Sequence, residues 1–197
     1  YDINPLIIMN FYKNKKVKKE FNSSKYNIPD GVGTVYASKM KNIALKERIA
    51  GIDFFKDLCN LSIEKELSIF LYGSEEGIAD KVKKELEEKY HGINIAGTLN
   101  GYVKESEALK KIKEAQPDIL FVALGSPLQE KFIIKNKKQF SNIKIIMPVG
   151  GTFDVIAGKI KRAPKIIIKL NLEWIYRMLK EPKRIFVNIK LIKFVFL

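Results

Sequence analysis

The chain has 197 residues, of which 46% are hydrophobic and 29% are charged, a balance typical of one folded globular domain rather than a disordered segment. Its single cysteine excludes an internal disulfide, and one cysteine with one histidine argues against a zinc site built from protein ligands. The formal net charge of +14 predicts attraction to phosphate groups on nucleic acid, anionic lipid or a diphosphate substrate. Because the chain starts with Tyr1 instead of Met, we expect it to be short at its N-terminus.

Two residues among the first fifty could carry chemistry. Asp30 stands between Pro29 and Gly31, on a shaped turn before an expected helix. An Asp at such a position is either a helix cap or a general base that takes a proton from a substrate hydroxyl, and the pattern leaves both open. Further along, Arg48 could bind a phosphate or pair with its neighbour Glu47.

The middle of the chain alternates between apolar runs of strand length and amphipathic stretches of helical period. This alternation predicts an α/β fold in which a parallel sheet is covered by helices on both faces. The expected strands are Leu67–Tyr72, Ile93–Ala96, Ile119–Leu124 and Ile143–Val149, and the expected helices are Glu75–Tyr90, Ser106–Ala115 and Leu128–Phe140.

Three of these strands end in glycine followed by a hydroxyl residue. The sequences are Gly73-Ser74, Gly125-Ser126 and Gly150-Gly151-Thr152. Ligands of open parallel sheets bind beyond the carboxyl ends of the strands, where glycine lets the backbone approach them closely. We expect the hydroxyl residues to cap the helices that follow, whose N-termini bind phosphate readily. Any one such turn could be purely structural, but three at one edge predict a phosphate-ligand site.

Side chains just beyond these turns belong to the same candidate site. Gln129, Glu130 and Asp154 fall in the first turns of the helices that follow. No turn has the glycine spacing of a dinucleotide fingerprint or a Walker loop, which argues against NAD and ATP. The sequence also has no Asp-x-Asp pair to hold a metal on a sugar-nucleotide diphosphate. We therefore expect no metal and no cofactor, with charge stabilised by backbone amides and Lys or Arg.

The C-terminal segment is strongly basic. From Lys159 to Leu197 there are eleven Lys or Arg residues and two Glu, a net charge of +9. Apolar and aromatic residues such as Trp174 and Phe186 are interleaved with them, and Pro182 separates two expected helices. Basic amphipathic helices of this kind bind membrane surfaces, and the alternative is a helix packed on the sheet with its basic face in water.

Taken together, the motifs resemble the WecG/TagA/CpsF family of glycosyltransferases. The resemblance spans essentially the whole chain. It rests on Asn4-Pro5, residues 28–33 (IPDGVG), 47–51 (ERIAG), 121–131 (FVALGSPLQEK), 150–158 (GGTFDVIAG), 161–164 (KRAP), 172–177 (LEWIYR) and 181–184 (EPKR).

This resemblance implies a Rossmann-like glycosyltransferase core at 1–160 and a basic, amphipathic membrane-docking appendage at 161–197. It implies an inverting, metal-independent transfer from a UDP-sugar, such as UDP-N-acetylmannosamine, to undecaprenyl-diphosphate-linked N-acetylglucosamine in teichoic acid synthesis. Asp30 is then the expected base, Asn4, Arg48 and Gln129 are expected active-site residues, and Arg177 and Arg184 are expected to help complete the site. The enzyme is expected on the cytoplasmic face of a bacterial membrane.

Several alternatives stay open. Asp2 and Leu6 stand where the family usually has Thr and Glu, which leaves the activity of this chain and its donor open. Relatives transfer N-acetylmannosaminuronic acid or glucose, and a homo-oligomer is compatible with the sequence. From other classes, a nucleic-acid-binding module and a non-catalytic membrane adaptor fit the charge, although no nucleic-acid partner is expected from the resemblance.

Overall fold

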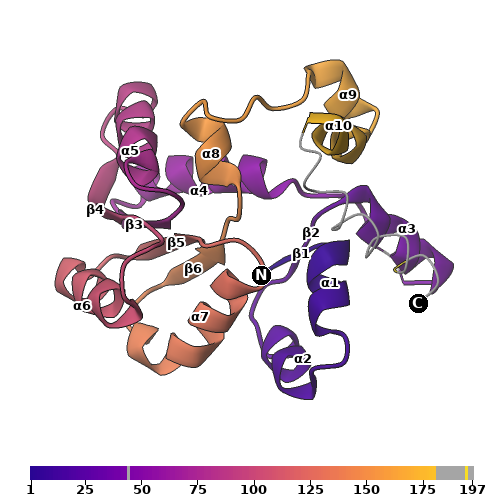
Figure 1. Ribbon diagram of the computed structural model, residues 1–197, viewed down its shortest axis with the longest axis horizontal. Coiled ribbons are helices and arrows are strands. Elements are labelled where there is room, and N and C mark those ends of the chain that lie inside the picture. Colours follow the sequence, from indigo (N-terminus) through magenta and orange to yellow (C-terminus); the bar gives the residue numbers. More distant parts are fainter. Residues whose placement is uncertain (44, 181–193, 195–197) are drawn as a thin grey trace. The chain divides into compact units, whose positions relative to one another are not determined.

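The computed structural model describes residues 1–43, 45–180 and 194, which fall into two compact units (Figure 1). One unit contains residues 51–160, and the other contains residues 1–50 together with the segment from 161 onward. The division into a core at 1–160 and a membrane-docking appendage at 161–197, which the resemblance implies, stays a prediction.

Residues 51–160 contain a four-stranded sheet whose neighbouring strands all run parallel. The strand order is β4-β3-β5-β6, so the chain adds β4 on one side of β3 and then continues on the other side. In open α/β sheets this reversal, here between β3 and β5, is the switch point at which ligands bind. The strands are β3 (Ser68–Gly73), β4 (Asn94–Leu99), β5 (Ile119–Ala123) and β6 (Ile145–Pro148).

Helices cover both faces of this sheet, with α4, α5 and α8 on one face and α6 and α7 on the other (Figure 1). The predicted α/β class, a parallel sheet flanked by helices, is therefore confirmed. The helices are α4 (Gly51–Glu64), α5 (Ile78–Lys89), α6 (Glu105–Ala115), α7 (Leu128–Asn136), the 3-10 helix η1 (Lys137–Phe140) and α8 (Thr152–Ile156).

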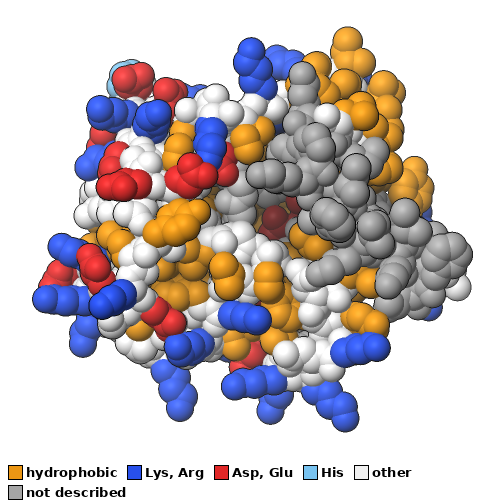
Figure 2. Space-filling view, in the orientation of Figure 1, with side chains coloured by type: hydrophobic (Ala, Val, Ile, Leu, Met, Phe, Trp, Pro, Cys, Tyr) orange, Lys and Arg blue, Asp and Glu red, His pale blue; other side chains and the backbone are white. Residues whose placement is uncertain are grey.

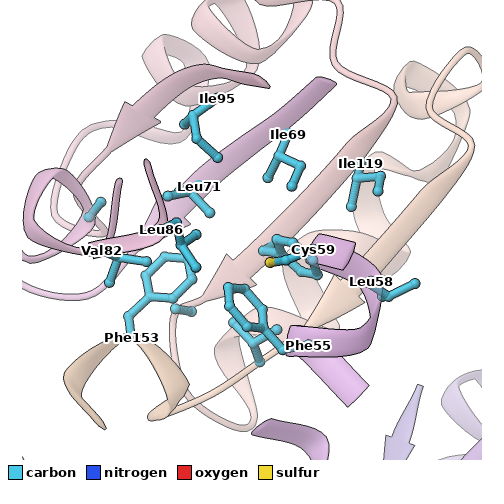
Figure 3. Close-up of a cluster of buried hydrophobic side chains, with 14 of the residues drawn as sticks. Phe55, Leu58, Cys59, Ile69, Leu71, Val82, Leu86, Ile95, Ile119 and Phe153 are labelled. Atoms are coloured by element: carbon cyan, nitrogen blue, oxygen red, sulfur yellow. The ribbon is translucent and has the colours of Figure 1, made fainter. Parts of the chain in front are cut away.

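The alternation of side chains along β3 divides the core in two. Ile69 and Leu71 are fully buried in the cluster that α4, α5 and α8 complete (Figure 3). Tyr72 belongs to the opposite face, where its ring lies 5.1 Å from that of Phe132 in α7. Because successive strand residues point to opposite faces, an unbroken apolar run is what a sheet covered on both sides requires.

Cys59 lies inside the first of these clusters (Figure 3). Its neighbour Phe55 stacks on Phe121 at 4.4 Å between ring centroids and meets Phe153 of α8 at 6.3 Å. Burial raises the pKa of the Cys59 thiol to about 12, with a smaller opposing effect of Lys89. The thiol therefore stays protonated and serves as a packing group.

The other unit contains a small parallel pair of strands with helices around it. Strand β1 pairs with β2, with Asp2 opposite Ile28 and Ile3 opposite Pro29. The elements are β1 (Asp2–Ile3), α1 (Pro5–Phe11), α2 (Lys15–Asn22), β2 (Ile28–Pro29), α3 (Val32–Met40), α9 (Lys165–Lys169) and α10 (Glu173–Lys180).

The structure corrects one expectation about the helix ends. Ser74, Ser126 and Thr152 do not act as N-caps, because α5, α7 and α8 are preceded by Gly77, Pro127 and Gly151 without a side-chain cap bond. Helix α5 begins three residues later than the sequence pattern suggests, at Ile78. The hydroxyl of Ser74 instead donates a hydrogen bond to Asp154 in α8.

The C-terminal segment is described only in part. Arg184 and the helix expected beyond Pro182 lie outside the described residues, and Arg177 lies in α10 without a described side chain. Among the described residues, no helix combines the length and the apolar character needed to cross a membrane.

Candidate active site

In the unit formed by residues 1–50 and 161 onward, Asn4 and Asp30 lie at corresponding strand ends. Asn4 follows β1 and Asp30 follows β2, and the backbone N–H of Asp30 donates to the carbonyl of Ile3 at 3.0 Å. The Asn4 side chain caps α1 by accepting from the N–H of Ile7 at 3.1 Å. Parallel strands thus bring together two predicted site residues that are 26 positions apart in the chain.

The turn after Asp30 needs glycine. Gly31 has a φ of +76°, a conformation that costs glycine little, and a Cβ there would meet the Pro5 ring at 3.2 Å. The Thr34 hydroxyl donates to the carbonyl of Asp30 at 2.8 Å. The Pro29-Asp30-Gly31 turn is therefore held from both sides, which fixes the base of the Asp30 side chain.

Arg48 joins two carboxylates that lie far apart in the sequence. Its Nε lies 3.3 Å from Asp30 Oδ1, and its Nη2 lies 3.1 Å from Glu173 Oε2 in α10. Arg162 approaches the other Glu173 oxygen, with Nε to Oε1 at 3.8 Å. The sequence had offered a phosphate or Glu47 as the partner of Arg48, and the structure gives it Asp30 and Glu173.

Asp30 and Glu173 keep the Arg48 guanidinium charged and fix its orientation. Burial alone would lower the pKa of its guanidinium, but the charges and hydrogen bonds of Asp30 and Glu173 outweigh burial and leave the pKa raised. Glu173 is almost fully buried, whereas the Asp30 side chain keeps 23% of its surface exposed. The Asp30 carboxylate is therefore partly open to solvent while Arg48 restrains it. The sequence had left Glu173 and Arg162 unassigned.

In the unit of residues 51–160, the end of β3 is tied to α8 and to the end of β5. The backbone N–H of Ser74 donates to the Ala123 carbonyl at 2.8 Å, and its hydroxyl donates to Asp154 Oδ1 at 2.9 Å. Lys159 adds a positive charge here, with its Nζ 2.7 Å from Glu75 and 3.9 Å from Asp154. Two predicted residues, Ser74 and Asp154, are thus in contact, and Lys159 and Glu75 are additional members.

Glycine is required at the end of β3 for a packing reason. A Cβ on Gly73 would lie 2.4 Å from the backbone of Ala123, and the φ of Gly73 is +131°, which residues other than glycine rarely adopt. At Gly125, Gly150 and Gly151, by contrast, an added Cβ would meet nothing within 4 Å. At these three glycines the space where a side chain would be is open, and the phosphate site that the sequence suggests at this edge stays a prediction.

A third set of contacts links α7 to the turn after β6. Gln129 accepts from the backbone N–H of Gly150 through its side-chain oxygen at 3.0 Å, and its Nε2 donates to Glu130 Oε1 at 2.9 Å. Gln129 is 5% exposed and Glu130 is 0% exposed. Burial raises the pKa of the Glu130 carboxyl, while hydrogen bonds from Gln129 and Ser126 act in the opposite direction. Both side chains serve the turn in this structure, and a direct role in substrate binding stays a prediction.

Carboxylates in the described residues take part in ion pairs and hydrogen bonds. Within the part of the chain that the structure describes, no three His, Cys, Asp or Glu side chains gather as a metal site.

Comparison with known proteins identifies the family. The sequence pattern of the Glycosyl transferase WecG/TagA/CpsF family matches residues 1–197. The chain belongs to this glycosyltransferase family. Among similar members of the WecG/TagA/CpsF family is the N-acetylglucosaminyldiphosphoundecaprenol N-acetyl-beta-D-mannosaminyltransferase of Bacillus subtilis (strain 168), 40% identical over 183 residues, or 92% of this chain and 71% of the relative.

Other members of the WecG/TagA/CpsF family carry the same name. The enzyme of Bacillus spizizenii is 38% identical over 182 residues, which cover 92% of this chain and 70% of the relative. That of Staphylococcus aureus (strain MRSA252) is 34% identical over 184 residues, covering 92% and 72%. Membership in the WecG/TagA/CpsF family indicates that the chemistry of this chain is glycosyl transfer.

Proposed function

We propose that this chain is an inverting glycosyltransferase that moves N-acetylmannosamine from UDP to N-acetylglucosamine on undecaprenyl diphosphate, in teichoic acid synthesis. The observation that carries the proposal is the 40% identity to a relative whose name specifies this sugar and this acceptor. The Asp30–Arg48–Glu173 chain of charges supports it, because an inverting transfer uses a positioned base for the acceptor hydroxyl and Arg48 positions the Asp30 carboxylate.

In the proposed reaction, the acceptor hydroxyl oxygen attacks the anomeric carbon of the donor sugar as the bond from that carbon to the diphosphate oxygen breaks. The proton of the hydroxyl passes to Asp30, and UDP leaves with the electron pair of the broken bond. The transition state has oxocarbenium character, as glycosyl transfer generally does. Asp30 suits the role of base because its carboxylate is fixed by Arg48 yet partly exposed.

Arg48 and Asn4 have positioning roles in this proposal. Arg48 holds Asp30 through Nε and thereby fixes the direction of its carboxylate. Asn4, at the neighbouring strand end, keeps its amide nitrogen available for a sugar hydroxyl while its Oδ1 caps α1.

The donor is assigned to the carboxyl edge of the sheet in residues 51–160. The open backbone at Gly125 and Gly151 suits the diphosphate, and Lys159 offsets its charge. Ser74 and Asp154 supply hydrogen-bonding groups for the nucleoside. Since backbone and lysine supply the stabilisation, the reaction proceeds without a metal ion.

The lipid-linked acceptor implies work at a membrane surface. Hydrophobic side chains gather over α9 and α10 in the space-filling view (Figure 2). Five are exposed: Ile166, Leu170, Leu172, Trp174 and Leu179, which we call the α9–α10 patch. Together with exposed Lys165 and Lys169, this patch suits shallow insertion into an anionic surface. We propose that the patch docks the enzyme on the cytoplasmic face of the membrane, the face that the family resemblance implies.

A donor screen tests the proposal. UDP-N-acetylmannosamine, UDP-N-acetylglucosamine, UDP-N-acetylmannosaminuronic acid and UDP-glucose are each incubated with the enzyme and a synthetic lipid-diphosphate-N-acetylglucosamine, and released UDP is measured. We expect release with UDP-N-acetylmannosamine that depends on the acceptor, and a product with the inverted anomeric configuration by NMR. Release with another donor would replace the sugar assignment. No release with any donor, together with salt-dependent binding of RNA or DNA, would overturn the proposal.

A further inference from the structure

We propose that Glu130 is a positioning residue: its carboxyl fixes the carboxamide of Gln129, and that carboxamide holds the Gly150 turn at the carboxyl edge of the sheet. The proposal concerns a contact within residues 51–160 and stands on its geometry. Its consequence for donor binding rests on the proposed function.

The hydrogen bonds of the Gln129 side chain fix its orientation. A backbone N–H can only donate, so the Gln129 atom that faces Gly150 at 3.0 Å has to be its oxygen. Its nitrogen then faces Glu130 Oε1 at 2.9 Å and needs an acceptor there. Both polar atoms of the Gln129 carboxamide are therefore hydrogen-bonded. Glu130 accepts from the nitrogen, and this bond fixes the carboxamide with its oxygen toward Gly150.

Placing an acid at position 130 costs free energy, because the side chain is buried. Glu130 is 0% exposed, and its Oε2 is buried with no hydrogen-bond partner among the described residues. The ion pairs of the described residues do not include Glu130. An apolar side chain of the same length would avoid the cost of burying these polar atoms. What the carboxyl provides, and an apolar group cannot, is an acceptor for Gln129 and for Ser126, of which the Gln129 bond leads on to the Gly150 turn.

The contact with Gln129 does not require Glu130 to be charged. Burial raises the pKa of Glu130, which favours the neutral form. A neutral carboxyl still has a carbonyl oxygen that accepts from Gln129. A glutamine in its place would offer the same acceptor with nearly the same shape, whereas methionine would fill the space and offer none.

The Gln129–Gly150 hydrogen bond lies at the carboxyl edge of the sheet. Gly150 follows β6 and has a φ of +50°, and nothing packs where its Cβ would be. Gly150 itself has no side chain to anchor it, and hydrogen bonds hold the turn: the N–H of Thr152 donates to the Val149 carbonyl at 3.1 Å, and the N–H of Gly150 is given to Gln129. This N–H is consequently unavailable to a phosphate, and its role is to keep the Gly150-Gly151 backbone in one arrangement.

Glu130→Met and Glu130→Gln form the test pair, with Glu88→Gln on the exposed surface of α5 as the control. Hydrogen exchange of the Gly150 amide is measured by NMR without ligand, and the Kd for UDP is measured by calorimetry. We expect Glu130→Met to speed Gly150 exchange and to weaken UDP binding, each by about fivefold, as for one ordinary hydrogen bond. Glu130→Gln should restore both to near the original values, and the control should change neither.

A double-mutant cycle separates positioning from other roles. Gln129→Met should match Glu130→Met in Gly150 exchange, and the double variant should show no further increase, because the two side chains act in series. Unchanged exchange in Glu130→Met, additive effects in the double variant, or a Glu130→Gln protein as impaired as Glu130→Met would each overturn the proposal. So would a Glu130→Met protein that does not fold. If the unmodified protein fails to bind UDP, the proposed function fails, while the exchange data still decide the role of Glu130.

Discussion

Asp30 and Arg48 restrain each other, and this restraint matters more for orientation than for stability. Partly exposed ion pairs contribute at most about 1 kcal/mol, because water screens them and side-chain entropy is lost. What the pair provides is a carboxylate held at one angle at the end of β2, next to Asn4. Glu173 extends the restraint, since it binds Nη2 of the same guanidinium.

Replacing Asp30 by Asn is expected to reduce turnover by about 10²–10⁴-fold, the usual contribution of a general base. Asn cannot take the acceptor proton, but it keeps the shape and one hydrogen-bond acceptor for Arg48. Steady-state kinetics with the lipid acceptor and calorimetry with UDP measure the effect, and UDP binding should persist. Asp57→Asn, on the exposed side of α4, is the matched control. Full activity in Asp30→Asn would remove Asp30 from the mechanism.

Asp118 makes a separate prediction about pH. A hydrogen bond from Lys144 and another from the Ser68 backbone lower its pKa from 3.8 to about 2. Because the folded pKa lies below the unfolded value, this carboxylate stabilises the fold above pH 4, and its contribution is lost as the pH falls from about 4 to about 2. The side chain joins β3 to the start of β6, with 2.9 Å to Ser68 N and 2.8 Å to Lys144 Nζ.

Urea unfolding of Asp118→Asn checks this expectation. The variant should be less stable than the unmodified protein at pH 7, and the difference should shrink toward zero near pH 2, because protonation then neutralises the native carboxylate as well. A difference that is the same at pH 7 and at pH 2 would contradict the assigned cause. Asp57→Asn again serves as the control.

At the scale of the elements, long apolar runs were predictable and short pairings were not. The four strands of the main sheet follow the apolar runs because both faces are covered, so burial decides the pattern. Strands β1 and β2 have two residues each, too few for any periodicity. Their existence depends on pairing across 25 residues, which no local pattern encodes.

The helix caps and the Arg48 partners show the same limit. Ser74 is one residue beyond β3 and was expected to cap α5, but the turn is longer, and its hydroxyl reaches Asp154 of α8 instead. Glu173 lies 125 residues from Arg48. Its presence within the 172–177 motif was the one signal that could have drawn attention to it. Contacts between strand ends follow from topology, whereas contacts to α10 require the tertiary structure.

The α9–α10 patch supports a prediction that belongs to these two helices. The double substitution Ile166→Ser with Leu170→Ser should reduce sedimentation with phosphatidylglycerol-rich vesicles by about tenfold or more, since each buried aliphatic side chain contributes about 1.5–3 kcal/mol. Both side chains are largely exposed, so the fold and UDP binding should be retained. Tyr26→Ser, which removes an exposed ring elsewhere in the same unit, is the control. Unchanged sedimentation of the double variant would exclude these helices from docking.

Substitutions suit this test better than truncation. A chain ending before Lys165 would lose Glu173 as well as the patch, and Glu173 is a direct partner of Arg48. Loss of transfer in such a truncation would therefore mix weaker docking with a disturbed Asp30–Arg48 pair. Glu173→Gln isolates the second effect, because it leaves the exposed side chains of α9 and α10 in place.

At the scale of the whole molecule, the charge determines how a diphosphate can be held. The chain carries 36 Lys and Arg against 22 Asp and Glu, with one His and no Asp-x-Asp pair. Positive side chains and backbone amides are thus abundant, and the usual metal-binding pattern of sugar-nucleotide enzymes is missing from the sequence. Salt will weaken a binding mode of this kind, because exposed charges are screened beyond roughly 8–10 Å at 0.1–0.15 M.

The resulting expectation is that transfer continues in EDTA. The initial rate of UDP release from UDP-N-acetylmannosamine and the lipid acceptor is compared with and without excess chelator. EDTA is itself a polyanion and can compete for basic sites on a chain of charge +14, so a parallel reaction contains the same concentration of EDTA already saturated with calcium. Equal rates in all three reactions agree with stabilisation by Lys159 and backbone amides. Inhibition by free and calcium-loaded EDTA that disappears as the donor concentration rises reflects anion competition. Inhibition that added magnesium or manganese reverses, and that excess donor does not, would require a metal ion on the diphosphate and would overturn the metal-independent mechanism.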